Sequence, residues 1–293
     1  EQAETILAHR YFLKDTEGEP IEDSTQLFWR VAKAIAKVDY QYEVFASDVS
    51  LLEQTFFEMM YKLEFLPNSP TLMNAGTAQG TLSACFVLPL EDSMEQIMKA
   101  ATDAAMVQKF GGGTGFSLSK IRPKGATIQS THGVACGPIE VLKTLSRVSS
   151  MITQGGKRDG ANMAVMSVRH PDILSFIDCK KEEGEIHNFN ISVAVDKAFM
   201  HSVKLDQNYV LNDPKTGFPV STLNAREVFL KIVQGAWRNG EPGMVFLDRI
   251  NEDNKVGEEY GDMIATNPCG EQPLLGYESC NLGSINIAKF VYP

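Results

Sequence analysis

Two cysteines near the end of the chain stand among residue types that are suited to chemistry. Cys269 is the middle residue of Asn-Pro-Cys-Gly-Glu at 267–271, and Cys280 follows eleven residues later. Proline holds the residue before it extended and glycine lets the chain reverse, so we expect a turn that presents Asn267, Cys269 and Glu271 in the same direction. The alternative is an ordinary surface turn, which would leave an exposed thiol open to oxidation. The carboxylate and the carboxamide beside the thiol favour a reactive site.

The other cysteines and the histidines give no sign of a metal site. The five cysteines include no Cys-x-x-Cys pair, and the five histidines share no ligand spacing. Cys136 and Cys179 have no chemical neighbours in the sequence and are predicted to be packing residues. Five cysteines in 293 residues do not indicate a secreted disulfide framework. We therefore expect reduced thiols and a cytoplasmic location.

Two glycine-rich stretches each allow two interpretations. Residues 111–115 (Gly-Gly-Gly-Thr-Gly) fit neither the P-loop nor the dinucleotide-binding pattern. They form either a flexible turn between a helix and a strand or a place of close backbone approach to a ligand. Residues 153–160 contain Lys157 and Arg158 among three glycines. This segment is either a basic helix C-terminus or a mobile loop that senses a bound ligand through its two cations.

The composition is that of a globular protein without an extended basic face. Apolar residues make up 43% of the chain and charged residues 22%, and the net charge is −10. Direct binding of nucleic acid is therefore not expected, although a few local donors could still hold a small anion. The start of the chain has no secretory signal, and no stretch approaches the roughly 18 apolar residues of a membrane span.

The apolar pattern divides the chain into a helical region and an α/β region. Residues 1–66 form the predicted helical domain, with Asp23 and Ser24 as the cap of one helix. Two prolines within 66–70 end this region, and residues 67–293 form the second predicted domain. There we expect strands at 83–88, 116–121, 163–168, 190–195 and 243–247, and helices at 94–110, 138–152, 171–179 and 225–237. Strands that alternate with helices indicate an α/β fold with a largely parallel sheet.

Several motifs in this order resemble the catalytic subunit of ribonucleotide reductase. They lie at 66–76, 83–85, 155–158, 267–275 and 279–286, and look most like the adenosylcobalamin-dependent, class II branch. The resemblance runs through essentially the whole chain. It implies a helical N-terminal region followed by a ten-stranded α/β barrel, built from two five-stranded halves, with a finger loop inside. This chain would supply the helical region, the first half-barrel and the finger loop.

The resemblance also implies a reaction, the reduction of ribonucleotides to deoxyribonucleotides. Cys269 would become a thiyl radical and remove the 3′ hydrogen of the substrate. Glu271 would accept the 3′-hydroxyl proton, and Asn267 would hold the substrate hydroxyls and orient Glu271. Cys85 and Cys280 would be the dithiol that ends as a disulfide, which requires their Cα atoms to come within about 7 Å. The radical would come from adenosylcobalamin, since side chains do not generate one unaided.

Further positions match the family's binding sites. Substrate would touch Ser69, Ala84, Cys85 and Gly113 as well as Asn267, Cys269 and Glu271. A deoxynucleoside triphosphate effector would bind at Asp92 and Arg122, and Lys157 and Arg158 would lie on the loop that links effector to substrate choice. The helices at 94–110 and 138–152 resemble those of the family's dimer contact, so a homodimer is expected.

Two features depart from the family pattern. The chain ends at Pro293, and Gly276 stands where the class II pattern has proline. We therefore expect a fragment or one half of a split gene, completed by a chain that carries the C-terminal half-barrel and served by a thioredoxin-type reductant. Two alternatives remain open at this point. One is an inactive module that binds nucleotide and dimerises; the other is a class I large subunit, to which a second protein delivers the radical.

Overall fold

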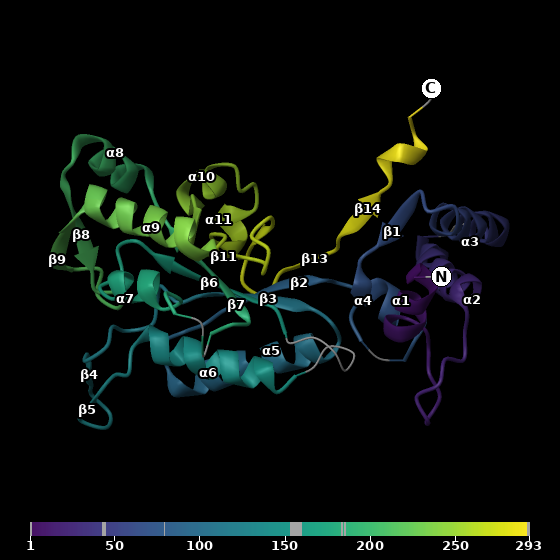
Figure 1. Ribbon diagram of the computed structural model, residues 1–293, viewed down its shortest axis with the longest axis horizontal. Helices are drawn as coiled ribbons and strands as arrows, with labels where there is room; N and C mark the ends of the chain where they lie inside the picture. The colour runs from purple at the N-terminus through teal and green to yellow at the C-terminus, as the bar shows by residue number, and fades with distance from the viewer. Residues whose placement is uncertain are drawn as a thin grey trace. The chain divides into compact units, whose positions relative to one another are not determined.

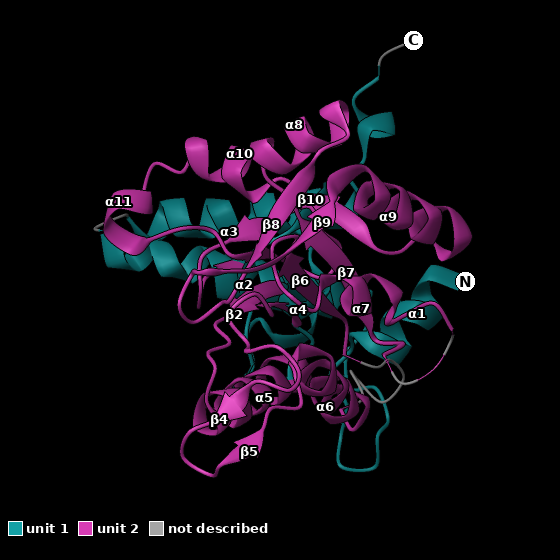
Figure 2. Ribbon diagram, turned by 90° about the vertical axis from the view of Figure 1, so that its left-hand side faces the viewer, with its two compact units in different colours: residues 1–84, 110–112, 280–293 teal, residues 85–109, 113–279 magenta. Residues whose placement is uncertain are grey.

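The computed structural model describes residues 2–42, 45–78, 80–152, 160–182, 184 and 186–291. The chain divides into two compact units, shown in two colours in Figure 2. Unit 1 contains residues 1–84, 110–112 and 280–293, and unit 2 contains residues 85–109 and 113–279. Each unit has its own hydrophobic core and is described by itself.

Unit 1 is mainly helical, as the sequence predicted. Its helices are α1 (Gln2–Arg10), α2 (Ser24–Ala36), η1 (Lys37–Tyr42), α3 (Ala46–Tyr61), α4 (Ser69–Asn74) and η3 (Ile287–Lys289), and its strands β1 (Phe65–Pro67) and β14 (Gly283–Ile285) pair antiparallel. Asp23 and Gln26 form a capping box at the start of α2, which confirms the predicted cap. Leu27, Phe28 and Val31 of α2 are buried in the unit 1 core.

The ion pair of Arg30 with Glu22 lies beside the C-terminal end of α4 within unit 1. The two side chains meet at 2.7 Å and are largely buried. The Arg30 guanidinium also donates to the carbonyl oxygens of Leu72 and Ala75, which lie in and just after α4. A buried guanidinium needs several acceptors, and this set ties α2 to α4.

Unit 2 is built around a six-stranded sheet (Figure 1). Its strands are β2 (Cys85–Leu88), β3 (Gly113–Ser117), β6 (Asn162–Ser167), β7 (Phe189–Ala194), β10 (Gly243–Val245) and β13 (Ser279–Cys280, of which Cys280 is counted with unit 1), in the order β10-β7-β6-β3-β2-β13. Strands β2, β3, β6, β7 and β10 are parallel, and each lies beside the one before it. The sheet thus grows in one direction, as half of a barrel must.

Helices connect these parallel strands on one side of the sheet. They are α5 (Met94–Lys109), α6 (Pro138–Ser150), α7 (Ile173–Asp178), α8 (Lys197–Leu205) and α9 (Ala225–Asn239), followed by α10 (Leu247–Glu252) and α11 (Gly257–Tyr260). Right-handed crossovers in sequential order place their helices on one face, and in Figure 2 α5, α6, α7 and α9 follow one another around one side of the strands. Phe116, Met166 and Phe189 are buried in the core of this unit.

Three short hairpins complete unit 2. They are β4–β5 (Thr127–Ile128 and Gly133–Val134), β8–β9 (Asn208–Asn212 and Pro219–Asn224) and β11–β12 (Ala265–Thr266 and Pro273–Leu274). None of the helices within the described ranges has the length and apolar character of a membrane span.

The predicted fold class is confirmed, with one shift in the sheet. A helical N-terminal region precedes an α/β unit whose five parallel strands have the order expected for the first half of a ten-stranded barrel. The strand predicted at 116–121 lies instead at Gly113–Ser117, so Gly113 and Gly115 are part of the strand. Helix α8 and the β8–β9 hairpin had no counterpart among the predicted elements.

Candidate active site

The segment around Cys269 forms the tip of the β11–β12 hairpin, here called the finger hairpin (residues 265–274). Its strands pair Ala265 with Leu274 and Thr266 with Pro273. The amide of Gly270 donates to the carbonyl of Asn267 at 3.0 Å, which closes a four-residue turn with proline and cysteine at its corners. Gly270 has a φ of +84°, a backbone conformation that residues with a side chain rarely adopt. The predicted chain reversal after the thiol is confirmed.

The finger hairpin lies against the glycines of β3. A Cβ atom on Gly115 would sit 1.9 Å from the Thr266 carbonyl oxygen, and one on Gly113 would sit 2.6 Å from Cγ of Pro268. Only glycine permits this approach. Of the two interpretations of the glycine run, close backbone approach therefore applies at these positions, but the group that approaches is the protein's own hairpin.

Asn267 is directed into unit 2 and not toward solvent. Its side chain is fully buried. Its Nδ2 donates to Sγ of Cys85 at 3.2 Å, and its Oδ1 accepts from the Gln272 amide at 3.0 Å. Cys85 is the first residue of β2 and is itself buried. The hairpin residue and the strand cysteine, both predicted as catalytic residues, are thus brought together.

Cys269 and Glu271 differ from Asn267 because both are exposed. The expectation that the turn presents all three side chains in the same direction is therefore corrected. The physical reason is that the Asn267 carboxamide is bonded to Cys85 on β2 and to Gln272 across the hairpin. The turn that follows places Cys269 and Glu271 outside this contact. An exposed thiol and an exposed carboxylate two residues apart remain at the tip.

Asn190 is a site residue that the sequence analysis missed. Its Nδ2 donates to the carbonyl oxygen of Pro268 at 2.7 Å, across 78 positions of sequence. The flanking residues Phe189 and Ile191 are buried in the unit 2 core, so the alternation of the strand turns Asn190 to the opposite face. The alternation of Asn190 and Ser192 with the apolar residues Phe189, Ile191 and Val193 was the signal that could have found it.

Three predicted site residues belong to unit 1. Cys280 is half-buried, and its carbonyl oxygen accepts from the amide of Ala84 at 3.0 Å. Ser69 begins α4, and its hydroxyl lies 2.9 Å from the Tyr11 hydroxyl. All five cysteines lie within the described residues, and they form no disulfide.

The predicted effector residues Asp92 and Arg122 meet in unit 2. Nε of Arg122 lies 2.7 Å from Oδ2 of Asp92, and the Arg122 amide donates to the other carboxylate oxygen at 3.1 Å. Both side chains remain partly exposed, and Asp92 stands just before α5. Lys157 and Arg158, the other two residues of this prediction, lie outside the described residues.

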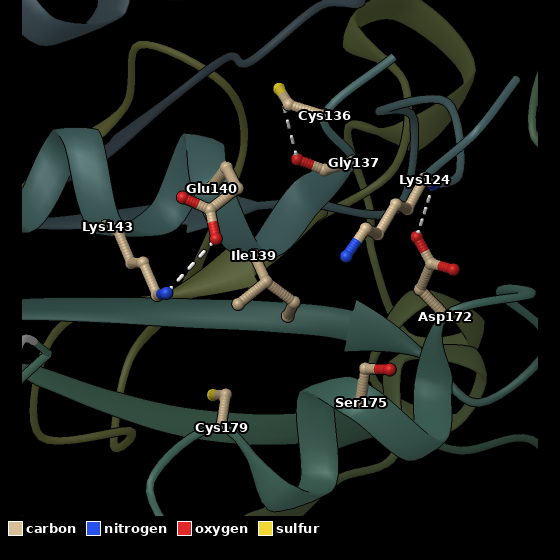
Figure 3. A pocket seen from close by; sticks show the side chains of 9 residues that line it. All are labelled: Lys124, Cys136, Gly137, Ile139, Glu140, Lys143, Asp172, Ser175 and Cys179. Carbon is tan, nitrogen blue, oxygen red and sulfur yellow. Dashed lines mark hydrogen bonds and ion pairs between the residues drawn. The ribbon is translucent and has the colours of Figure 1, made fainter. Parts of the chain in front are cut away.

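A separate pocket of about 260 Å³ lies between the start of α6 and α7 (Figure 3). It is lined by Lys124, Cys136, Gly137, Ile139, Glu140, Lys143, Asp172, Ser175 and Cys179. Lys143 pairs with Glu140 at 3.0 Å, and the Asp172 carboxylate accepts from the backbone amide of Lys124 at 2.8 Å. Burial raises the pKa of Cys179 to about 12, which fits its predicted packing role. Cys136, also predicted to pack, is exposed.

Two family models match the chain. The model described as "Ribonucleotide reductase, all-alpha domain" matches residues 1–80, and the one described as "Ribonucleotide reductase, barrel domain" matches residues 83–293. Together they include all of the predicted site residues.

Curated relatives match along nearly the whole chain. A vitamin B12-dependent ribonucleoside-diphosphate reductase of Mycobacterium tuberculosis is 45% identical over 290 residues, which are 99% of this chain and 42% of the relative. A protein of the same description from Thermoplasma acidophilum is 41% identical over 340 residues, covering 98% of this chain and 44% of the relative. A vitamin B12-dependent ribonucleotide reductase of Streptomyces clavuligerus is 33% identical, covering 99% and 33%. The chain thus spans about two-fifths of the length of the first two.

Proposed function

This chain belongs to the ribonucleotide reductase family, and on that premise we propose that it is the N-terminal part of a cobalamin-dependent reductase that converts ribonucleotides to deoxyribonucleotides. The observation that carries the proposal is the hydrogen bond between Asn267 and Cys85. It joins a residue of the finger hairpin to a strand cysteine, as a site that uses both must do. The remainder of the barrel would complete the protein.

The exposed hairpin tip carries the groups for hydrogen abstraction. In the proposed reaction Cys269 acts as a thiyl radical and removes the 3′ hydrogen atom of the ribose. Glu271 accepts the proton of the 3′-hydroxyl, which requires the carboxylate to come within hydrogen-bond reach of that group. Both side chains are exposed, so substrate can approach them. Asn267 fixes the base of the turn through its bonds to Cys85 and Gln272.

Cys85 and Cys280 supply the two reducing equivalents. Their thiols are oxidised to one disulfide while the substrate loses its 2′-hydroxyl as water, so two hydrogen atoms leave the thiols, one into water and one onto C2′. A thioredoxin-type reductant would restore the thiols.

The radical source proposed for this chain is adenosylcobalamin. When bound, it supplies the unpaired electron with which Cys269 begins each turnover. The Cys269 thiol fits this radical source, because it is exposed at the tip of a hairpin whose base is buried. The names of the relatives support the same assignment.

An effector and a second copy of the chain complete the proposal. The Asp92–Arg122 pair would bind the ribose and phosphates of a deoxynucleoside triphosphate. Helices α5 and α6 would form the dimer contact. The methionines Met94, Met98 and Met106 are exposed on α5, while Ala100 and Ala104 of the same helix are buried in the unit's core. The proposed location is the cytoplasm, where thiols stay reduced.

The test is conversion of ribonucleotides by the complete protein with adenosylcobalamin and a dithiol. We expect deoxyribonucleotide to form only when cobalamin is present. Activity that depends instead on a radical-generating protein would assign the chain to the metal-dependent class. Binding of a deoxynucleoside triphosphate without any turnover would leave only a nucleotide-binding and dimerising role.

A further inference from the structure

We propose that Asn190 is a positioning residue for Cys269. Its amide holds the carbonyl oxygen of Pro268, the last backbone acceptor before the thiol, and so sets where the thiol stands above the sheet. The inference rests on the proposed role of Cys269 as the radical carrier. It adds a residue of β7 to a site that the sequence assigned to β2 and the finger hairpin.

The chain before Cys269 is fixed at three successive residues. The Thr266 carbonyl passes directly over Gly115, where no Cβ would fit. Asn267 is bonded to Cys85 through its side chain. The Pro268 carbonyl is then held by Asn190 at 2.7 Å. The thiol is carried by the first residue after the last of these anchors, so Asn190 is the anchor nearest to it.

The hairpin ladder alone does not hold the tip. Its last paired residues are Thr266 and Pro273, so the loop from 267 to 272 depends on other bonds. Within the loop, Gln272 bonds to Asn267 and Gly270 bonds to Asn267, which shape the turn but do not tie it to the sheet. On the C-terminal side of Asn267, the hydrogen bond from Asn190 attaches the loop to the sheet. Asn190 lies on β7, which β6 separates from β3.

Packing does not explain an asparagine at this position. Asn190 is exposed, whereas its neighbours Phe189 and Ile191 fill the core on the other face. An exposed side chain contributes little to the core, so its replacement leaves the fold intact. The replacement therefore acts mainly by removing the hydrogen bond to the hairpin. This loss matters because a displacement near 1 Å at a reacting group costs about 100-fold in rate.

The first test measures kcat and KM separately in the complete reductase. Asn190→Ala removes the donor, and Asn190→Asp keeps the shape but replaces the donor with an acceptor that faces the Pro268 carbonyl. We expect kcat to fall about 10-fold to 100-fold in both variants with KM changed less than about twofold. Ser192→Ala is the matched control, since Ser192 lies two residues further on the same face of β7. It should retain kcat.

The second test follows the thiol itself. The alkylation rate of Cys269 by a neutral maleimide is compared with that of Cys136, the other exposed cysteine, in the same sample. Asn190→Ala should change the Cys269 rate by at least about threefold through a looser tip, and leave Cys136 unchanged.

The outcomes separate this inference from the proposed function. If Asn190→Ala leaves both kcat and the Cys269 alkylation rate at wild-type values while Cys269→Ser abolishes turnover, the positioning role is wrong and the proposed function stands. If Cys269→Ser retains turnover, the proposed function itself fails. A rise in KM at unchanged kcat would also overturn the positioning role, because it would make Asn190 a substrate-binding residue.

Discussion

The side-chain amide of Asn267 donates a hydrogen bond to the sulfur of Cys85 across 182 positions of sequence. Both groups are buried, so this contact is part of the interior of unit 2. It links the finger hairpin to the first strand of the parallel sheet. The proposed radical carrier Cys269 stands two residues further, on the exposed side of the same hairpin. One short segment therefore contacts a buried cysteine and also carries an exposed tip.

Replacing Asn267 tests how far this contact holds the hairpin. Asn267→Ala removes the acceptor for the Gln272 backbone amide and the buried donor to Cys85. We expect the free energy of unfolding to fall by about 1–3 kcal/mol, as for a lost buried hydrogen bond. Denaturant titration measures it. The double variant Asn267→Ala, Cys85→Ala isolates the Cys85 contact, so two costs that simply add would contradict its role.

Cys269→Ser should abolish reduction, because a serine hydroxyl does not form the radical that a thiol forms. Effector binding should be unchanged, since Asp92 and Arg122 are held by their own ion pair. Product formation and equilibrium binding of a deoxynucleoside triphosphate are measured on one preparation. Cys136→Ser, which changes an exposed cysteine outside the finger hairpin, is the control. Retained turnover in Cys269→Ser would sink the assignment.

Gly115→Ala should displace the finger hairpin. The added Cβ would meet the Thr266 carbonyl oxygen at 1.9 Å, so strand or hairpin must move. We expect a loss of about 1–3 kcal/mol in the free energy of unfolding, typical of overpacking, and a loss of turnover. Gly133→Ala is the control, because its Cβ would meet only a Thr131 oxygen at 3.5 Å. Equal stability of the two variants would refute the close contact.

Arg122→Lys should weaken effector binding without unfolding the protein. Arg122 bonds to Asp92 through its guanidinium and its own amide, and lysine lacks the planar donor set that pairs with a carboxylate and phosphates. We expect an affinity loss of about tenfold. In the unaltered protein the matching substrate should tighten effector binding by the same factor by which effector tightens substrate binding. Calorimetric titrations that show no mutual effect would argue against an effector site here.

The stability of the protein should fall in mild acid because of His170. Burial lowers its pKa below the ordinary value of 6.5, against the opposing effect of a hydrogen bond to the Ile121 carbonyl. The folded state thus binds this proton less tightly than the unfolded state. The contribution is fully present above 6.5 and is lost as the pH falls toward the folded pKa.

Denaturant titrations at several pH values measure this contribution. The difference in unfolding free energy between about pH 7.5 and pH 5.5 should be smaller in His170→Gln than in the unaltered protein. An identical pH dependence in the two proteins would show that His170 is not the group responsible.

Local sequence signals predicted the elements and the family motifs. The Asp23 cap and the helical spacing of Leu27, Phe28 and Val31 set α2, because capping and amphipathic periodicity act within one or two turns. The buried strands β2, β6 and β7 lie close to the apolar runs that predicted them. The turn at Cys269 followed from a proline before it and a glycine after it.

The displaced strand β3 shows where local signals fail. Glycine is a poor strand former, so the run at 111–115 predicted a turn, and the strand was expected only from Phe116. The structure places β3 at Gly113–Ser117 because the finger hairpin crosses it and leaves no room for side chains. The position of β3 therefore depends on a segment about 150 positions later in the sequence.

The sequence by itself determined the α/β pattern, the family and the identity of the cysteines, the asparagine and the glutamate at the proposed site. Only the tertiary structure decided that Asn267 turns inward to Cys85, that β3 carries the hairpin on its glycines, and that Asn190 holds Pro268. The physical reason is that these contacts join segments 78 or more positions apart. Periodicity and turn chemistry act over a few residues, whereas the packing of the hairpin on the sheet sets where each polar group finds its partner.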